Sequence, residues 1–524
     1  MAGGDRGAGL ALFRTGLAAA ALCALITGQA IAGPMVRVDG GALTGSAADG
    51  VVAFKAIPYA APPTGDLRWR PPAGPAAWSG ARDATAYGPD CPQNRPSWDP
   101  TQSKLPTSED CLTLNVWTPN ASDETHRPVM VWIHGGGFTM GSGSQPIFDG
   151  TALAQRGLVV VTFNYRLGRF GFFAHPALTR EAAGGPVGNY ALMDQIAALR
   201  WVRRNIAAFG GDPGNVTIFG ESAGGGSVEL LLLAKDARGL FQKAISQSGG
   251  GRDDWPALGA DRPGKPSAEH IGEAFAKAAG ASGDDAAALR AIPMAKVLGK
   301  LDLLHGEADT YSGPMMDGRL ITTNPADGFL AGRQARVPLL IGANSNELGF
   351  IPAIFLGAIN AEAIRRLGPD LARVVEAYGA KSEFDARIAS DQNFVEPART
   401  LAGAMAAAGT PTFLYSFGYV PSAKRATQKG APHASELAFV FGNLSELRLA
   451  TTPEDAREAR LVGDYWTRFA RTGDPNGAGR PTWPAYHRRD DLRLVFNGGG
   501  AGAENSPAAP LDALAAHYAA PTPR

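Results

Sequence analysis

The chain has 524 residues, of which 45% are hydrophobic and 19% charged, and its 49 Lys and Arg balance its 49 Asp and Glu. This composition is typical of a globular protein with a large core, and it excludes an intrinsically disordered chain. The balanced charge provides no general attraction to nucleic acids or to anionic membranes.

The first predicted element is an export signal. Arg6 and Arg14 precede a short apolar stretch, and Ala30-Ile31-Ala32 has the small-x-small pattern of a cleavage site. The apolar stretch is shorter than the roughly 20 residues that a membrane-spanning helix needs. We therefore predict a signal peptide over 1–32, a mature domain over 33–524 with no integral membrane segment, and a secreted or periplasmic location. An amphipathic or buried first helix is the alternative.

The cysteines agree with export. Cys23 lies inside the predicted signal, which leaves Cys91 and Cys111 in the mature chain. In an exported protein such a pair can form a disulfide, and this one would close a short loop. Two unpaired buried thiols are the alternative.

Apolar runs along the chain predict a sheet with both faces covered, because they are too apolar for a sheet with one face in water. The predicted strands cover 129–133, 158–163, 216–219, 337–341 and 412–417.

Helical patterns alternate with these strands. Residues 189–206 carry apolar side chains at three- and four-residue spacing, which predicts a helix lying on the sheet. The Ala-rich stretch 250–304 predicts helices of a cap, and the residues from 498 onward are expected to be loosely held. The alternation predicts an α/β fold with a large, mostly parallel central sheet flanked by helices, with helical cap insertions.

A serine motif lies between the predicted strand 216–219 and a helix-compatible run, 226–233. The motif is Gly220-Glu221-Ser222-Ala223-Gly224. A G-x-S-x-G turn between a strand and a helix places the serine on a sharp elbow with its hydroxyl exposed, as in α/β-hydrolases. An isolated match would indicate only a glycine-rich turn, but the flanking strand and helix favour the elbow. Ser222 is therefore the predicted nucleophile.

A glycine run directly follows the predicted strand 129–133, in His134-Gly135-Gly136-Gly137-Phe138. Bare backbone N–H groups there could stabilise the oxyanion of a tetrahedral intermediate, and Gly136, Gly137 and Ala223 would supply them. The alternatives are a flexible loop and a phosphate-binding loop. The chain has no G-x-x-x-x-G-K-[ST] motif and no acidic ribose partner at the right spacing, which argues against the latter.

A serine hydroxyl needs a general base at neutral pH, and in this architecture the histidine and the acid follow the serine along the chain. His433, in a loop before the apolar run 437–441, is the predicted base on its position, and a surface histidine is the alternative. The other histidines after Ser222 are His270 and His305 in the cap region, His487 in a polar stretch, and His517 in the C-terminal tail.

The predicted acid is Glu347, which lies just past the strand at 337–341. The carboxyl ends of strands are where open α/β sheets place functional groups. Asp317 is the rival, and we interpret it as structural because its context, Met315-Met316-Asp317-Gly318, is turn-like.

At these residues the sequence resembles the type-B carboxylesterase family, which includes the cholinesterases. The resemblance spans most of the mature chain, and together its motifs are more specific than any one of them. They are Glu109-Asp110-Cys111-Leu112-Thr113-Leu114-Asn115-Val116, His134-Gly135-Gly136-Gly137-Phe138, Asn164-Tyr165-Arg166-Leu167-Gly168, Phe209-Gly210-Gly211-Asp212-Pro213, Gly220-Glu221-Ser222-Ala223-Gly224-Gly225 and Ser246-Gln247-Ser248-Gly249.

The resemblance implies hydrolysis of small-molecule carboxylic esters. We predict a two-step reaction through an acyl-enzyme, with no nucleic-acid partner. The chain has no H-E-x-x-H motif and no paired C-x-x-C, so no metal or organic cofactor is predicted. The resemblance implies Glu347 as the acid and His433 as the histidine of the catalytic triad. It also implies that Glu221 and Ser248 support these residues. A catalytically inactive, cholinesterase-like binding protein is the alternative, as is the same fold acting on carbamates, amides or lipids.

Two further points follow from the resemblance. It implies a disulfide between Cys91 and Cys111. Members of the family often have glycine directly after the catalytic histidine, and this chain has Ala434 there.

Overall fold

The structure is a computed structural model, and it describes residues 33–96, 101–121, 124–281, 283, 285–301, 311–351 and 353–519. The predicted signal peptide, Cys23 and His305 lie outside these residues. Pro34–Arg524 forms one compact unit, to which all the following elements belong. Among the described helices, none combines the length and the apolar character that a membrane span requires.

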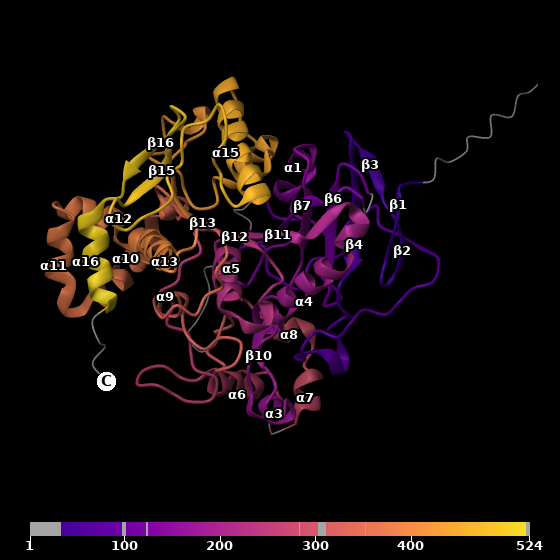
Figure 1. The fold of residues 1–524 in the computed structure, drawn as a ribbon. Coiled ribbons are helices and arrows are strands. Elements are labelled where there is room, and N and C mark those ends of the chain that lie inside the picture. Colours follow the sequence, from indigo (N-terminus) through magenta and orange to yellow (C-terminus); the bar gives the residue numbers. More distant parts are fainter. Residues whose placement is uncertain are drawn as a thin grey trace, which may run out of the picture. The chain divides into compact units, whose positions relative to one another are not determined.

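A large mixed sheet forms the centre of this unit (Figure 1). Its strands, in spatial order, are β16 (Ala501–Asn505), β15 (Leu492–Phe496), β14 (Thr412–Phe417), β13 (Leu339–Asn344), β12 (Lys243–Gln247), β11 (Gly211–Glu221), β7 (Arg127–Ile133), β8 (Val159–Phe163), β6 (Thr113–Thr118), β4 (Val51–Pro58) and β3 (Ser46–Ala48). Neighbours from β15 to β8 pair in parallel, whereas the pairs at both ends are antiparallel. The predicted mostly parallel sheet is therefore confirmed.

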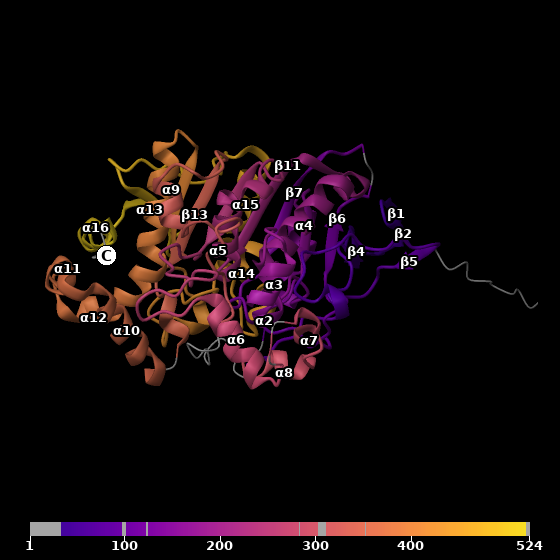
Figure 2. The same ribbon diagram turned by 90° about the horizontal axis from the view of Figure 1, so that it is seen from below.

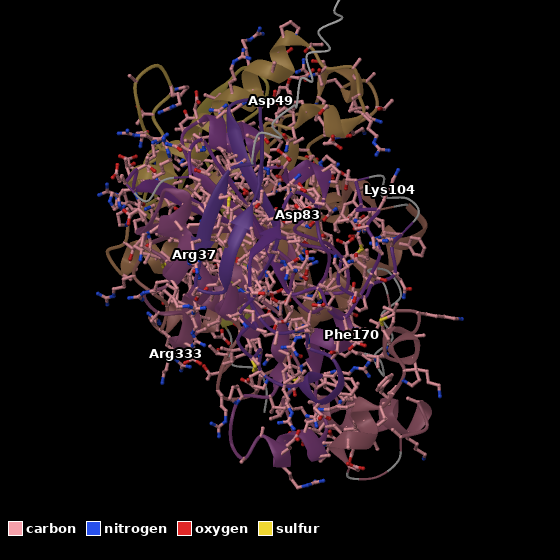
Figure 3. All side chains as sticks on the ribbon, turned by 90° about the vertical axis from the view of Figure 1, so that its right-hand side faces the viewer. Arg37, Asp49, Asp83, Lys104, Phe170 and Arg333 are labelled. Carbon is pink, nitrogen blue, oxygen red and sulfur yellow. A yellow bond between two sulfur atoms is a disulfide. The ribbon has the colours of Figure 1, made fainter. Side chains whose placement is uncertain are left out.

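Two smaller sheets form outside the central one. One joins β1 (Met35–Val38), β2 (Gly41–Thr44) and β5 (Ala81–Asp83), and the other joins β9 (Phe172–Phe173) and β10 (Gly188–Asn189). Arg37, Asp49 and Asp83 are exposed on the side that carries the N-terminal strands (Figure 3).

The five predicted strands are all present; β14 has the predicted bounds, and the other four have shifted ends. β13 begins at Leu339 rather than at residue 337, because Pro338 has no N–H to donate to the sheet. β11 begins earlier than predicted, at Gly211, and a register shift separates Gly211 from the regular pairing with β7 that starts at Val216.

Helices cover both faces of the sheet (Figures 1 and 2). Val131 packs in the cluster on one face and its neighbour Trp132 in the cluster on the other, so one apolar strand serves two cores. The first face is covered by α4 (Tyr190–Asn205), α5 (Ala223–Leu233), α9 (Pro325–Leu330) and α13 (Glu396–Ala407), and the second by α1 (Thr151–Gln155), α14 (Leu437–Phe441) and α15 (Pro453–Thr472). The predicted helix at 189–206 is α4, and its apolar stripe is buried.

The predicted cap is also helical. Its helices α6 (Ala268–Ala278), α7 (Ala286–Arg290) and α8 (Met294–Leu298) share a separate apolar cluster with α2 (Gly168–Gly171) and α3 (Pro176–Glu181). A second group packs together from α10 (Ala353–Leu367), α11 (Leu371–Ala377), α12 (Lys381–Ser390) and α16 (Ala508–Ala519).

The prediction of a loosely held C-terminal segment is wrong. β16 pairs with β15, and α16 buries Leu511 and Leu514. The high Gly, Ala and Pro content concealed these elements, because two leucines one helical turn apart suffice to anchor a short helix whose remaining residues are small.

The predicted disulfide between Cys91 and Cys111 is present, with both residues buried. It closes a loop of sequence separation 20, so we expect the Cys91→Ser, Cys111→Ser double variant to lose about 3 kcal/mol of unfolding free energy. Urea denaturation would measure the loss, and wild-type protein unfolded with a thiol reductant should match the variant. Coincident midpoints for oxidised wild type and variant would contradict this expectation.

Candidate active site

Ser222 lies at a sharp turn between β11 and α5. Its backbone φ of 58° and ψ of −126° fall where non-glycine residues are strained. A Cβ on Gly220 would lie 2.8 Å from the carbonyl oxygen of Ile133, and one on Gly224 would collide with the same oxygen. The glycines of the motif are therefore required by the close approach of β7, as the elbow prediction expects.

The glycine run after β7 lies directly against this turn. A Cβ on Gly135 would lie 3.1 Å from the Cβ of Ser222, and Gly136 and Gly137 both have positive φ. Among the described residues, no backbone oxygen accepts from the N–H groups of Gly136 and Gly137. The N–H of Ala223, in the first turn of α5, has no acceptor within the helix. These amides are thus available to an oxygen atom beside Ser222.

His433 and Glu347 are in direct contact. Nδ1 of His433 lies 2.6 Å from Oε2 of Glu347. The other carboxylate oxygen, Oε1, accepts from the hydroxyl of Ser248 at 2.7 Å and from the backbone N–H of Asn344 at 2.6 Å. Glu347 is fully buried, where an unpaired charge would be costly. Each of its carboxylate oxygens has a polar partner, which offsets that cost.

The loop that carries His433 is fastened to the end of β13. The side chain of Asn344 donates to the carbonyl of Pro432 at 2.7 Å, and the backbone N–H of His433 donates to the carbonyl of Glu347 at 3.1 Å. Ala434 follows with a φ of 64°. This left-handed conformation costs a non-glycine residue about 1–2 kcal/mol, which explains why glycine is common there in the family that the sequence resembles.

The second ring nitrogen of His433 faces Glu221. Nε2 lies 3.0 Å from Oε1 of Glu221, the residue directly before Ser222. Within the described part of the chain, no hydrogen bond joins the ring to Ser222. Burial opposes the charged form of His433, but the carboxylates of Glu221 and Glu347 outweigh it and hold the pKa of the ring well above its ordinary 6.5.

A third buried carboxylate, Glu436, was not predicted from the sequence. Its oxygens accept from Gln247 at 2.9 Å and from Asn344 at 2.6 Å. Burial, followed by the charge of Glu221, raises the pKa of Glu436 to about 7. Asn344 thus joins two carboxylates, because its N–H donates to Glu347 and its side chain to Glu436. The only sequence signal was an acidic residue three positions after His433, which is too common to be informative.

Two aromatic rings flank His433, and the sequence did not reveal them either. The centroid of Phe350 lies 5.8 Å and that of Phe394 lies 5.0 Å from the imidazole. Phe394 belongs to a π-helical turn, Asp391–Val395, between α12 and α13. Such turns are rare and occur often at functional sites, but no sequence pattern marks this one.

The competing candidates lie elsewhere. Asp317 accepts N–H groups from Arg319 and Ile321 within its own turn, in agreement with a structural role. His270 is exposed and contacts Asp261, His487 is exposed, and His517 contacts Asp370 from α16.

Comparison with known proteins identifies the family. A model of the carboxylesterase family matches residues 32–369 and 376–505. The chain belongs to the carboxylesterase family. This result agrees with the resemblance seen in the motifs.

Two named esterases are similar to this carboxylesterase over nearly its whole length. It is 38% identical to the para-nitrobenzyl esterase of Bacillus subtilis over 480 residues, covering 88% of this chain and 94% of the relative. It is 36% identical to the fumonisin B1 esterase of Sphingopyxis macrogoltabida over 495 residues, covering 89% and 87%.

Solved structures agree. A PNB esterase superposes with a TM-score of 0.80 at 35% identity, covering 92% of this chain and 99% of that one. A carboxylesterase of Geobacillus stearothermophilus gives 0.77 at 35% identity with the same coverage. The protein therefore has the α/β-hydrolase fold and is a carboxylic ester hydrolase.

Proposed function

We propose that this carboxylesterase hydrolyses small-molecule esters through an acyl-enzyme on Ser222, with His433 as general base and Glu347 as the acid that orients it. The observation that carries the proposal is the 2.6 Å contact between His433 and a fully buried Glu347, beside the strained turn that presents Ser222. Both features support the proposal, because a serine nucleophile needs a base close by and the base needs an acid that orients it.

In the first step, the Ser222 hydroxyl attacks the ester carbonyl while Nε2 of His433 takes its proton. For this the imidazole turns from Glu221 toward Ser222; catalytic hydrogen bonds often form only once substrate is bound. The amides of Gly136, Gly137 and Ala223 stabilise the oxyanion. His433 then protonates the leaving alcohol, and the acyl group stays on Ser222. Water, deprotonated by His433, attacks the acyl-enzyme and releases the carboxylic acid.

Glu221 and Ser248 act on these residues without touching the substrate. Ser248 holds one oxygen of Glu347, so that the other is directed at Nδ1 of His433. Glu221 stabilises the imidazolium that forms in each step. We also propose that the protein is exported to the periplasm or the medium, which the buried disulfide between Cys91 and Cys111 supports.

Covalent labelling tests the proposal. A fluorophosphonate should phosphonylate Ser222 stoichiometrically, as mass spectrometry of the peptide that contains it would show. The Ser222→Ala variant should remain unlabelled at every serine. Labelling at another serine, or hydrolysis of p-nitrophenyl butyrate that survives full labelling, would contradict the assignment.

The acid limb of the pH profile reports on His433. Because the base must be neutral, kcat/KM should fall as pH drops through the raised pKa of His433. In a Glu221→Gln variant one of the two carboxylates that raise this pKa is gone, so the limb should move to lower pH while kcat falls. An exposed carboxylate on α6 provides the control, and Glu273→Gln should leave the limb in place. An unmoved limb in Glu221→Gln would show that Glu221 does not act on His433.

A further inference from the structure

The loop after β12 forms a wall beside the active site. A Cβ on Gly249 would collide with Glu229 of α5, the helix that begins after Ser222. A Cβ on Gly250 would lie 3.5 Å from the carbonyl oxygen of Asn393. Asn393 directly precedes Phe394, whose ring contacts His433. The loop therefore lies between the helix of the nucleophile and the turn that flanks the histidine.

Three charged residues follow on this loop, and two of them are paired. Arg252 binds Glu396 at 2.7 Å and stacks over the ring of Tyr518, 4.7 Å from its centroid. Asp254 pairs with Arg262 and Lys265. Both side chains are thus engaged by structural contacts.

Asp253, between them, has no such partner. Its side chain is exposed, and one carboxylate oxygen lies 3.7 Å from the Cβ position of Gly250, on the side of the loop that faces Asn393. Among the described residues no Lys, Arg or His forms an ion pair with it. Although the side chain of Asp253 is exposed, the protein around it raises its pKa by desolvation, and the N–H groups of the loop and the charge of Arg366 offset this only in part.

A second carboxylate with an unpartnered oxygen lies behind this loop. Glu229 is 1% exposed, and its Oε1 accepts from Ser246 at 2.8 Å, but its Oε2 has no partner in the described structure. That free oxygen lies 3.5 Å from the Cβ position of Gly251. The charge of Asp253 contributes to raising the pKa of Glu229, so the two carboxylates interact. Arg366, whose charge acts on Asp253, binds Glu362 and Asn393 instead.

We propose that Asp253 forms a subsite for a protonated amine on the substrate, so that this carboxylesterase prefers esters carrying a primary ammonium group over neutral or anionic ones. The proposal rests on ester hydrolysis at Ser222. An ammonium ion donates charge-assisted hydrogen bonds to a carboxylate and would give Asp253 the cationic partner that it lacks. A substrate carboxylate would instead meet the like charge of Asp253.

Matched esters test the preference in either half of the substrate. In the first series, p-nitrophenyl esters of 6-aminohexanoate, heptanoate and hydrogen pimelate differ only in the terminal ammonium, methyl or carboxylate group. In the second, butanoate esters of 6-aminohexanol and heptanol differ in the same way in the alcohol. We expect kcat/KM for the ammonium ester to exceed that for the methyl ester about tenfold in at least one series, and the pimelate ester to be the poorest.

The Asp253→Asn variant should abolish this preference by lowering kcat/KM for the ammonium ester to about that for the heptanoate ester. Asp254→Asn, one residue along the same loop, is the matched control and should keep the preference, because Asp254 is already paired. An ammonium-to-methyl ratio near one in both series, or a ratio unchanged in Asp253→Asn, would overturn the amine subsite alone. Failure to hydrolyse any of these esters would overturn the proposed function and the subsite with it.

Discussion

Replacing Ser222 with alanine is expected to lower kcat for p-nitrophenyl butyrate by about 10⁴-fold or more, with little change in stability. The side chain stands on a turn where its hydroxyl receives no hydrogen bond from His433, so its removal breaks no contact that holds the fold. Catalysis is lost because no other atom can carry the acyl group, and what remains comes from the oxyanion-binding amides and substrate binding.

A matched serine near the histidine separates chemistry from packing. Ser435 is two residues from His433, and its buried hydroxyl has no hydrogen-bond partner within the described structure. Ser435→Ala should keep kcat within about twofold of wild type. Thermal unfolding of both variants would show whether the fold is intact. Equal losses of activity in the two variants would point to disturbance of the site rather than removal of a nucleophile.

The sharp turn that carries Ser222, the proposed nucleophile, could be predicted from the sequence because its requirements are local. The turn around Ser222 requires glycines because β7 passes close to its backbone. The strand before the turn and the helix after it can each be predicted from their own apolar residues. The same holds for the glycine run after β7, whose backbone must approach Ser222 closely. Close backbone contact leaves no room for side chains, so these positions are occupied by glycine, which the sequence shows directly.

The environment of His433 could be predicted only in part. Position along the chain pointed to His433 and Glu347, and their contact across 86 residues is present. Glu436, Phe350 and Phe394 also surround the ring, but each is an ordinary residue type without a local pattern. Their proximity depends on how β13, the loop after β14 and the turn before α13 pack together. Such long-range packing leaves no mark within one segment of sequence.

For the C-terminal segment, the sequence-based prediction was wrong rather than incomplete. Its composition suggested a loose tail, yet α16 places Tyr518 over Arg252 in the loop beside the active site. The stabilising contacts come from a few side chains among many small ones. Composition averages over the segment and therefore hides them.

Replacing Glu347 with glutamine is expected to lower kcat by about 10³- to 10⁴-fold, the second large effect. The glutamine oxygen can still accept from Ser248 and Asn344, so the shape of the site is kept. Its amide group would then face Nδ1 of His433 and donate to it. The ring would have to carry its proton on Nε2, the nitrogen that must accept the proton of Ser222, and it would lose the charge that stabilises the imidazolium.

The rival acid supplies the control for this substitution. Asp317→Asn keeps an oxygen that can accept from Arg319 and Ile321, so it should lower stability slightly and leave kcat within about threefold of wild type. Steady-state hydrolysis of p-nitrophenyl butyrate by the two variants decides between the carboxylates. If Asp317→Asn lost the activity and Glu347→Gln retained it, the acid would be assigned to the wrong residue. The description of the fold would stand in that case. The 2.6 Å contact between His433 and Glu347 would be an ion pair that positions the loop and has no part in catalysis.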